Sequence, residues 1–233
     1  VGTAAQKIIL TSTHDDTAGG DSNANGNATM PQRGDWEAVY LDSNSPGATL
    51  QQVEIRHAGN AFNPGNAGAF VPALQLRDKA DVTLTDVMVL ESDSTGVYIT
   101  ANSPALTRVK VDGARHDAFF AEIAATPTLV NLTATRAGTN AYVLAGGTIS
   151  DNRTWDFGGL PVHVTSNVTV ATGNAMTIVP GQVVKFHQGA FFELNGLLDA
   201  RGTSIKPIIL TSVPDDTAGG DSNANETATG PLA

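Results

Sequence analysis

A short repeat runs through the middle of the chain and limits the folds open to it. Four segments of the form L-x-x-[VL]-x-[AIV] begin at Leu50, Leu84, Leu106 and Leu129. The last two spacings are 22 and 23 residues, and an inserted loop over 59–68 accounts for the longer first spacing of 34. A period of this length that keeps its phase is typical of solenoids, in which each repeat stacks on its neighbours.

A second set of short apolar segments lies between these four, and Asp, Asn, Ser, Pro and Gly turns join the two sets. The segments are 39–41, 73–76, 96–99, 118–121 and 141–144. Two or three strands per rung of about 22 residues predict an all-β parallel β-helix. An antiparallel sandwich would also space its strands 8 to 12 residues apart. The in-phase recurrence favours the solenoid, with Leu84, Leu106 and Leu129 in one inward ladder and Val87, Val109 and Leu132 in the next.

A much longer repeat connects the two ends of the sequence. Residues 2–33 match residues 202–233 at an offset of 200, with 21 identities in 32 positions. The shared core is IILTS followed, two residues later, by DDTAGGDSNAN. We therefore divide the chain into one complete repeat unit, 1–200, and the opening segment of a second copy, 201–233. The parent is expected to be a tandem array.

Composition excludes several classes of partner. Asp and Glu number 23 against 13 Lys and Arg, a net charge of −10, which opposes the basic patch that nucleic-acid binding requires. No apolar run approaches the roughly 18 residues of a membrane span, so we expect no membrane insertion in this segment. The chain has no Cys, and its 27 Thr outnumber Lys and Glu together. This bias favours strands and is compatible with a secreted microbial surface protein.

Several motifs resemble those of secreted right-handed parallel β-helix proteins of bacteria and archaea, in the pectate-lyase-like superfamily. They are Pro180-Gly181, 183–186 (VVKF), Asn195-Gly196, Gly202-Thr203, Pro207-Ile208, Thr211-Ser212, the DD…GGD loop, 34–36 (GDW) and 53–56 (VEIR). Together they cover most of the chain. The resemblance implies a right-handed β-helix in an extracellular or cell-surface setting. It implies no single activity, because the family includes adhesins, stalk-like repeats and carbohydrate-active enzymes.

The loop after the opening strand predicts a calcium site. Asp21, Asn23, Asn25 and Gly26 fit the first half of a calcium loop, in which oxygens at positions 1, 3 and 5 converge on the ion and glycine permits the turn. Gln32 stands where an EF-hand has its bidentate Glu. We expect the missing negative charge to come from the neighbouring carboxylates Asp15, Asp16, Asp35 and Glu37.

The second copy offers a related but weaker calcium site. Its candidate ligands are Asp215, Asp216, Asp221, Asn223 and Asn225. Glu226 replaces the glycine of the first loop, so this site is expected to be weaker or incomplete. For both loops the alternative is a solvated Asn/Asp/Gly-rich turn without a metal.

These observations leave two functions open. The leading hypothesis is a calcium-stabilised structural repeat of an extracellular filament, stalk or adhesin, which stacks end to end with further copies. The alternative is a carbohydrate-binding or carbohydrate-cleaving β-helix, with surface glycans as partners. No complete catalytic set stands out, since the N-T-D and G-H-G motifs of polygalacturonases and the G-x-S-x-G motif of serine hydrolases are absent. A groove that gathers acidic and aromatic side chains on one face would favour the alternative.

Overall fold

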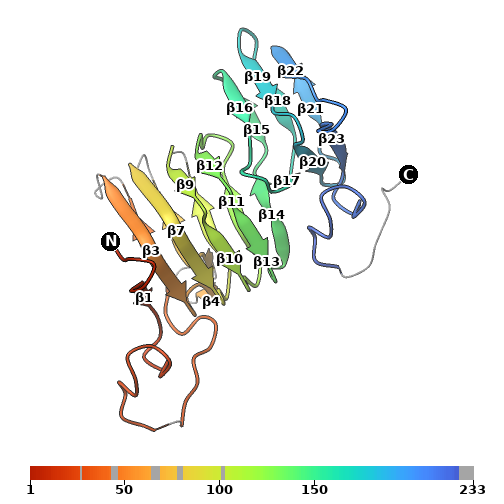
Figure 1. Cartoon of the computed structure of the whole chain (residues 1–233). Helices are drawn as coiled ribbons and strands as arrows, with labels where there is room; N and C mark the ends of the chain where they lie inside the picture. Colours follow the sequence, from red (N-terminus) through yellow and green to blue (C-terminus); the bar gives the residue numbers. More distant parts are fainter. Residues whose placement is uncertain (27, 43–46, 64–68, 78–80, 101–102, 226–233) are drawn as a thin grey trace.

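The chain folds into a parallel β-solenoid of about six turns, with rungs of about 23 residues (Figure 1). This is a computed structural model, and it describes residues 1–26, 28–42, 47–63, 69–77, 81–100 and 103–225. Within these ranges every regular element is a strand. The prediction of a parallel β-helix is confirmed, and the antiparallel sandwich is excluded because the strands of successive rungs run parallel.

The main strands form two large sheets and two small ones along the solenoid. The eight-stranded sheet contains β2 (Val39–Leu41), β6 (Leu74–Leu76), β8 (Val97–Ile99), β11 (Asp117–Ala121), β14 (Thr139–Leu144), β17 (Val162–Val164), β20 (Val183–Phe186) and β23 (Ile209–Ser212). The seven-stranded sheet contains β1 (Ile8–Leu10), β3 (Ala48–Arg56), β7 (Val82–Leu90), β9 (Ala105–Thr107), β10 (Lys110–Asp112), β12 (Thr128–Val130) and β13 (Thr133–Thr135). One small sheet contains β15 (Gly147–Ile149), β18 (Val168–Val170) and β21 (Phe192–Leu194), and the other contains β16 (Arg153–Trp155), β19 (Ala175–Ile178) and β22 (Leu197–Ala200).

An antiparallel pair stands outside the solenoid sheets, at the place where the first repeat spacing is long. It consists of β4 (Asn60–Asn63) and β5 (Ala69–Val71). The insertion expected over 59–68 therefore contains β4, the first strand of this pair. Residues 64–68 lie outside the described part of the chain.

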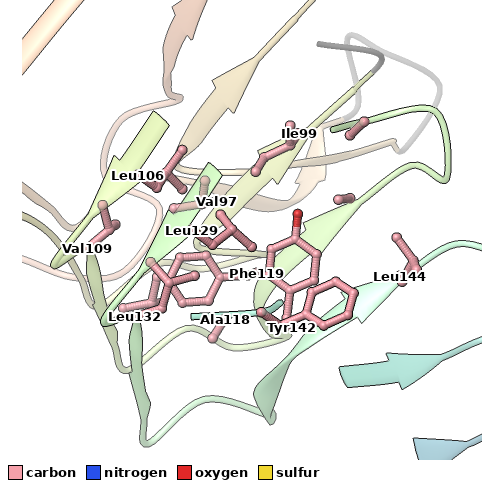
Figure 2. Packing of buried hydrophobic residues seen from close by; sticks show 14 of the residues in the cluster. Val97, Ile99, Leu106, Val109, Ala118, Phe119, Leu129, Leu132, Tyr142 and Leu144 are labelled. Carbon is pink, nitrogen blue, oxygen red and sulfur yellow. The ribbon is translucent and has the colours of Figure 1, made fainter. Parts of the chain in front are cut away.

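The four repeated leucines stack in register and fill the core. Leu50 pairs with Leu84, Leu84 with Leu106, and Leu106 with Leu129. The last three are buried, and Figure 2 shows Leu106 and Leu129 among the packed side chains of the interior. Val87, Val109 and Leu132, expected in the next ladder, are buried as well.

A repeated bend explains why both ladders point inward although their residues lie three positions apart in the sequence. Strict alternation along a strand would place Leu106 and Val109 on opposite faces. The residue between the two strand segments has a left-handed backbone, with φ between 52° and 54° at Gln52, Asp86, Arg108 and Asn131. This bend resets the alternation in each rung.

The two copies of the opening strand are edge strands of different sheets: β1 begins the seven-stranded sheet, and β23 ends the eight-stranded sheet. β1 pairs with a later strand, β3, whereas β23 pairs with an earlier strand, β20. In each case the acidic loop follows the strand as a long excursion from the sheets (Figure 1). The division into units at residue 200 stays a prediction.

Candidate functional site

The two acidic loops have the same internal hydrogen bonds. In the first loop, the Asp15 carboxylate accepts bonds from Thr11 Oγ1 at 2.8 Å, from Thr17 N at 3.2 Å and from the Thr17 hydroxyl. The same three bonds recur 200 residues later around Asp215. Burial alone would raise the pKa of Asp15, but the hydrogen bonds from Thr17 and Thr11 hold it below its usual range. Each loop therefore has a fixed shape of its own.

The loop gathers the three residues that the calcium motif singles out. Asp21 Oδ1 accepts a bond from Asn25 N at 3.0 Å, Asp21 Oδ2 accepts one from Gly26 N at 2.9 Å, and Asn23 Oδ1 lies 3.3 Å from Asn25 N. Two buried oxygens, Asp16 Oδ1 and Asn25 Oδ1, have no hydrogen-bond partner among the described residues. A buried oxygen without a donor is costly, and carboxylate and amide oxygens are ligands that Ca²⁺ prefers. Asp16 Oδ1 and Asn25 Oδ1 are therefore of the chemical type that ligates a cation.

The other expected ligands of the first loop have different partners. Asp35 Oδ2 accepts bonds from Ser12 Oγ at 2.6 Å and Gln32 N at 3.0 Å, and it lies 3.3 Å from His14 Nδ1. Glu37 accepts a bond from the Tyr40 hydroxyl at 3.1 Å. No group of three or more His, Asp and Glu side chains is arranged to hold a metal among the residues whose positions are described. The calcium set, including Asp15, Asp35 and Glu37, stays a prediction.

The second loop repeats this arrangement in part. Asp221 Oδ1 accepts a bond from Asn225 N at 3.1 Å, as Asp21 does from Asn25. Asn223 Oδ1 is a buried oxygen without a hydrogen-bond partner in the described chain, and Asp216 is half-buried in the same loop. Glu226 lies outside the described residues. A weaker second calcium site also stays a prediction.

The outer face of the eight-stranded sheet carries one continuous ladder of side chains. Because neighbouring residues of each strand point into the core, the middle residues point outward. The ladder consists of Tyr40, Gln75, Tyr98, Phe120, Val143, His163, Lys185 and Thr211. It has two different environments, an open groove over its first half and a covered cationic site over its second half.

The covered half holds a buried lysine and histidine under the second acidic loop. Lys185 Nζ donates to Ser222 Oγ at 2.7 Å and to Gly220 O at 3.0 Å, and Ser222 Oγ lies 2.8 Å from His163 Nε2. Lys185 is 0% exposed, and His163 and Ser222 are each 1% exposed. Asn140 N adds a bond to Ser222 O at 2.8 Å. We call Asn140, His163 and Lys185 the seat. The second acidic loop occupies it through Ser222.

Burial sets the protonation states in the seat. It lowers the pKa of His163 to about 3, and the neighbouring Lys185 charge acts in the same direction. Burial also lowers the pKa of Lys185, while the charges of Asp216, Asp215 and Asp221 oppose that shift. A neutral His163 accepts a hydrogen bond from the Ser222 hydroxyl, and the hydroxyl oxygen in turn accepts one from Lys185. Ser222 is too buried to meet a substrate.

The open half of the ladder forms a groove of about 690 Å³. Its walls combine aromatic, charged and amide side chains: Phe70, Gln75, Tyr98, Arg115, His116, Asp117 and Phe120. The Tyr98 and Phe120 rings lie 5.4 Å apart, and the Phe70 and His116 rings 4.9 Å apart. Burial raises the pKa of Asp117.

Sequence reasoning found the acidic loops but missed the seat and the groove. A signal for the seat was present, because His163 and Lys185 are the polar middle residues of VHV and VVKF. The pattern identifies them as outward-facing, but nothing in it shows that Ser222, 37 residues after Lys185, covers them.

In comparisons with protein-family models, curated proteins and solved structures, the chain has no significant match. The resemblance drawn from the motifs is thus confirmed only as a β-helix fold. Membership of the pectate-lyase-like superfamily and secretion stay predictions. No helix in the described part of the chain is long and apolar enough to cross a membrane.

The neutral, buried His163 predicts a loss of stability on mild acidification. Its folded pKa of about 3 lies below the usual value near 6.5, so between these pH values the unfolded chain binds a proton that the folded chain does not. Stability is therefore complete above pH 6.5 and falls as the pH drops. We expect a loss of about 2 kcal/mol between pH 7 and pH 5, measured by denaturant unfolding.

The matched variants are His163→Gln, which should remove this pH dependence, and His187→Gln, which should keep it. His187 lies near the seat, with its ring 6.0 Å from that of His163. An unchanged pH dependence in His163→Gln would contradict the assignment.

Proposed function

We propose that the chain is a structural repeat unit that continues end to end into further copies of itself, as part of an extracellular filament, stalk or adhesin. The support comes from the opening strand, whose two copies have neighbours on opposite sides: β1 pairs with β3, and β23 with β20. Placed together, these pairings give one strand two neighbours, and they join the eight-stranded sheet of one copy to the seven-stranded sheet of the next. Parallel strands gain stability from such neighbours, and unpaired edges are prone to association.

The register of the two pairings supports the same proposal. Leu10 pairs with Ile55, and its equivalent Leu210 pairs with Val184. Ile55 and Val184 are 0% exposed, whereas Leu10 is 36% and Leu210 is 51% exposed. At a junction the same leucine would stand between two buried aliphatic residues and complete an inward ladder. The contact joins different surfaces, so it propagates in one direction.

The extracellular setting rests on the sequence. A chain without Cys, rich in Thr, Asn and Gly and with the motifs of secreted β-helix proteins, is suited to a microbial surface. An extracellular setting would also favour calcium binding by the acidic loops. Calcium is abundant outside cells, and extracellular modules bind it through oxygen ligands.

The end-to-end proposal predicts that a two-unit chain, in which residues 1–200 are followed directly by residues 1–233, folds as one cooperative solenoid. Nearest-neighbour coupling should give a single unfolding transition with a higher midpoint and a denaturant dependence about twice as steep as for the 233-residue chain. Circular dichroism during denaturant titration measures this. Two independent transitions at the one-unit midpoint would contradict the proposal.

The calcium proposal predicts that a chelator lowers the thermal midpoint, because an ion that binds only the folded chain stabilises it by mass action. At a calcium concentration 100 times the Kd, the gain is about 2.7 kcal/mol. Asp21→Ala should remove most of the response to calcium. Ser204→Ala, in a turn away from both loops, is the matched control. Identical melting curves with calcium and with chelator would contradict the calcium proposal.

A second candidate function is glycan binding, and the groove is the observation that favours it. Tyr98 and Phe120 offer ring faces of the kind that stack on sugars, and Asp117, Gln75 and Arg115 offer polar partners beside them. The two functions are compatible, because a repeat of a surface adhesin can present one groove per unit.

Glycan binding predicts that acidic or neutral polysaccharides bind the chain and that Phe120→Ala weakens this binding by about tenfold or more, the loss of one stacked aromatic contact. Phe191→Ala, at an aromatic that is 51% exposed outside the groove, is the control. Binding is measured by calorimetry, with a parallel assay for new reducing ends or unsaturated products. Turnover that Asp117→Asn abolishes would make the groove an active site, and no binding to any polysaccharide would remove this candidate.

A further inference from the structure

The two acidic loops have the same internal structure but very different surroundings. Ser222 is buried in the seat, whereas its equivalent Ser22 is exposed. A Cβ added to Gly219 would lie 3.2 Å from Pro161 Cβ and 3.4 Å from Val183 Cγ1, while one added to Gly19 would meet nothing within 4 Å. The second loop is docked, and the first presents the same surface without a counterpart in the described chain.

The docking surface belongs to the rungs that come before the loop. Ser222 contacts Asn140, His163 and Lys185, which lie on β14, β17 and β20. Rungs with this sequence occur once in the chain, after the first loop and before the second. A seat for the first loop therefore exists only in another copy of the unit.

The first loop is already shaped to fit such a seat. Ser22 N donates to Gly20 O at 2.7 Å, as Ser222 N does to Gly220 O at 2.8 Å. The bonds that Thr17 N donates to Asp15 and Asn25 N donates to Asp21 also have their equivalents in the second loop. The sequence DDTAGGDSNAN is identical in both copies. Docking thus requires no reshaping and little loss of conformational entropy.

We propose that the first acidic loop is a latch that docks on the seat of the preceding copy, with Ser22 Oγ between Lys185 Nζ and His163 Nε2 of that copy and Ser22 O bound to its Asn140 N. This inference rests on the proposed end-to-end function and assigns the side chains of the junction. Asp15, Asp16 and Asp21 bring the same carboxylates toward the lysine that Asp215, Asp216 and Asp221 bring within the chain.

The latch also explains how a copy selects its neighbour. An outward lysine on a solenoid face is ordinarily solvated, and burying its charge is favourable only with well-placed acceptors. The loop supplies a hydroxyl and a backbone carbonyl at 2.7 and 3.0 Å, and three carboxylates near them. A different loop that covered the seat without these acceptors would leave the ammonium buried and unpaired, so the seat discriminates in favour of the same repeat.

The two-unit chain tests the latch through single cysteines, since the natural sequence has none. Ser22→Cys in the second unit places the thiol at the junction, and Ser22→Cys in the first unit places it on the free loop. We expect the junction thiol to react with a maleimide at least about 100-fold more slowly, because it reacts only after local opening. Lys185→Met in the first unit should restore fast reaction at the junction, and the same substitution in the second unit should not.

A second variant covers the case in which Lys185→Met does not fold. Ala218 belongs to the docked loop and is buried there, so Ala18→Trp in the second unit should expose the junction thiol, whereas Ala18→Trp in the first unit should be harmless. Two results would overturn the latch and leave end-to-end stacking intact, provided that unfolding remains a single transition. The first is a junction thiol that reacts fast without either further substitution. The second is a junction thiol that stays protected in both junction variants. Independent unfolding of the two units would overturn both.

Discussion

The structure depends on hydrogen bonding between parallel strands along the solenoid axis, with one inward side chain repeated at each level. Leu50, Leu84, Leu106 and Leu129 satisfy this constraint on four successive strands. Because each rung is stabilised by the rungs beside it, stability is a nearest-neighbour property, and the terminal rungs are the weak points. The constraint that builds the interior therefore also requires that each end be covered, by a cap or by another copy.

The ladder of outward side chains on the eight-stranded sheet has two different environments. Over its first half, Tyr98 and Phe120 line an open groove; under the second acidic loop, Lys185 and His163 are interior residues. Burying an ammonium group costs several kcal/mol unless hydrogen bonds replace its water. Ser222 and Gly220 replace it, so a feature that is unfavourable in isolation becomes specific for one loop sequence.

Periodicity made the core predictable from the sequence, because inward residues recur at the same phase in every rung. The left-handed bend was not predictable in the same way: the four bend residues share one backbone conformation, but their side chains are two amides, a carboxylate and a guanidinium. Arg108 donates to Asp86 at 2.6 and 2.7 Å, so neighbouring bends are joined by charge instead of by a common residue type. The seat was missed because it forms between residues far apart in sequence, whereas the calcium motif is local and can be read directly.

The proposed calcium site and the proposed latch would use the same carboxylates, and this connects the two proposals. In the docked loop, Asp216 and Asp221 lie close enough to Lys185 to favour its charged form, so an ammonium group already provides part of the positive charge. In the free loop, Asp16 Oδ1 and Asn25 Oδ1 are buried oxygens without a hydrogen-bond partner in the described chain. A divalent cation there would satisfy them and hold the Asx turns in the shape that the seat accepts. The ion would then act on assembly by keeping the latch folded before it meets the next copy, while the lysine secures it afterwards.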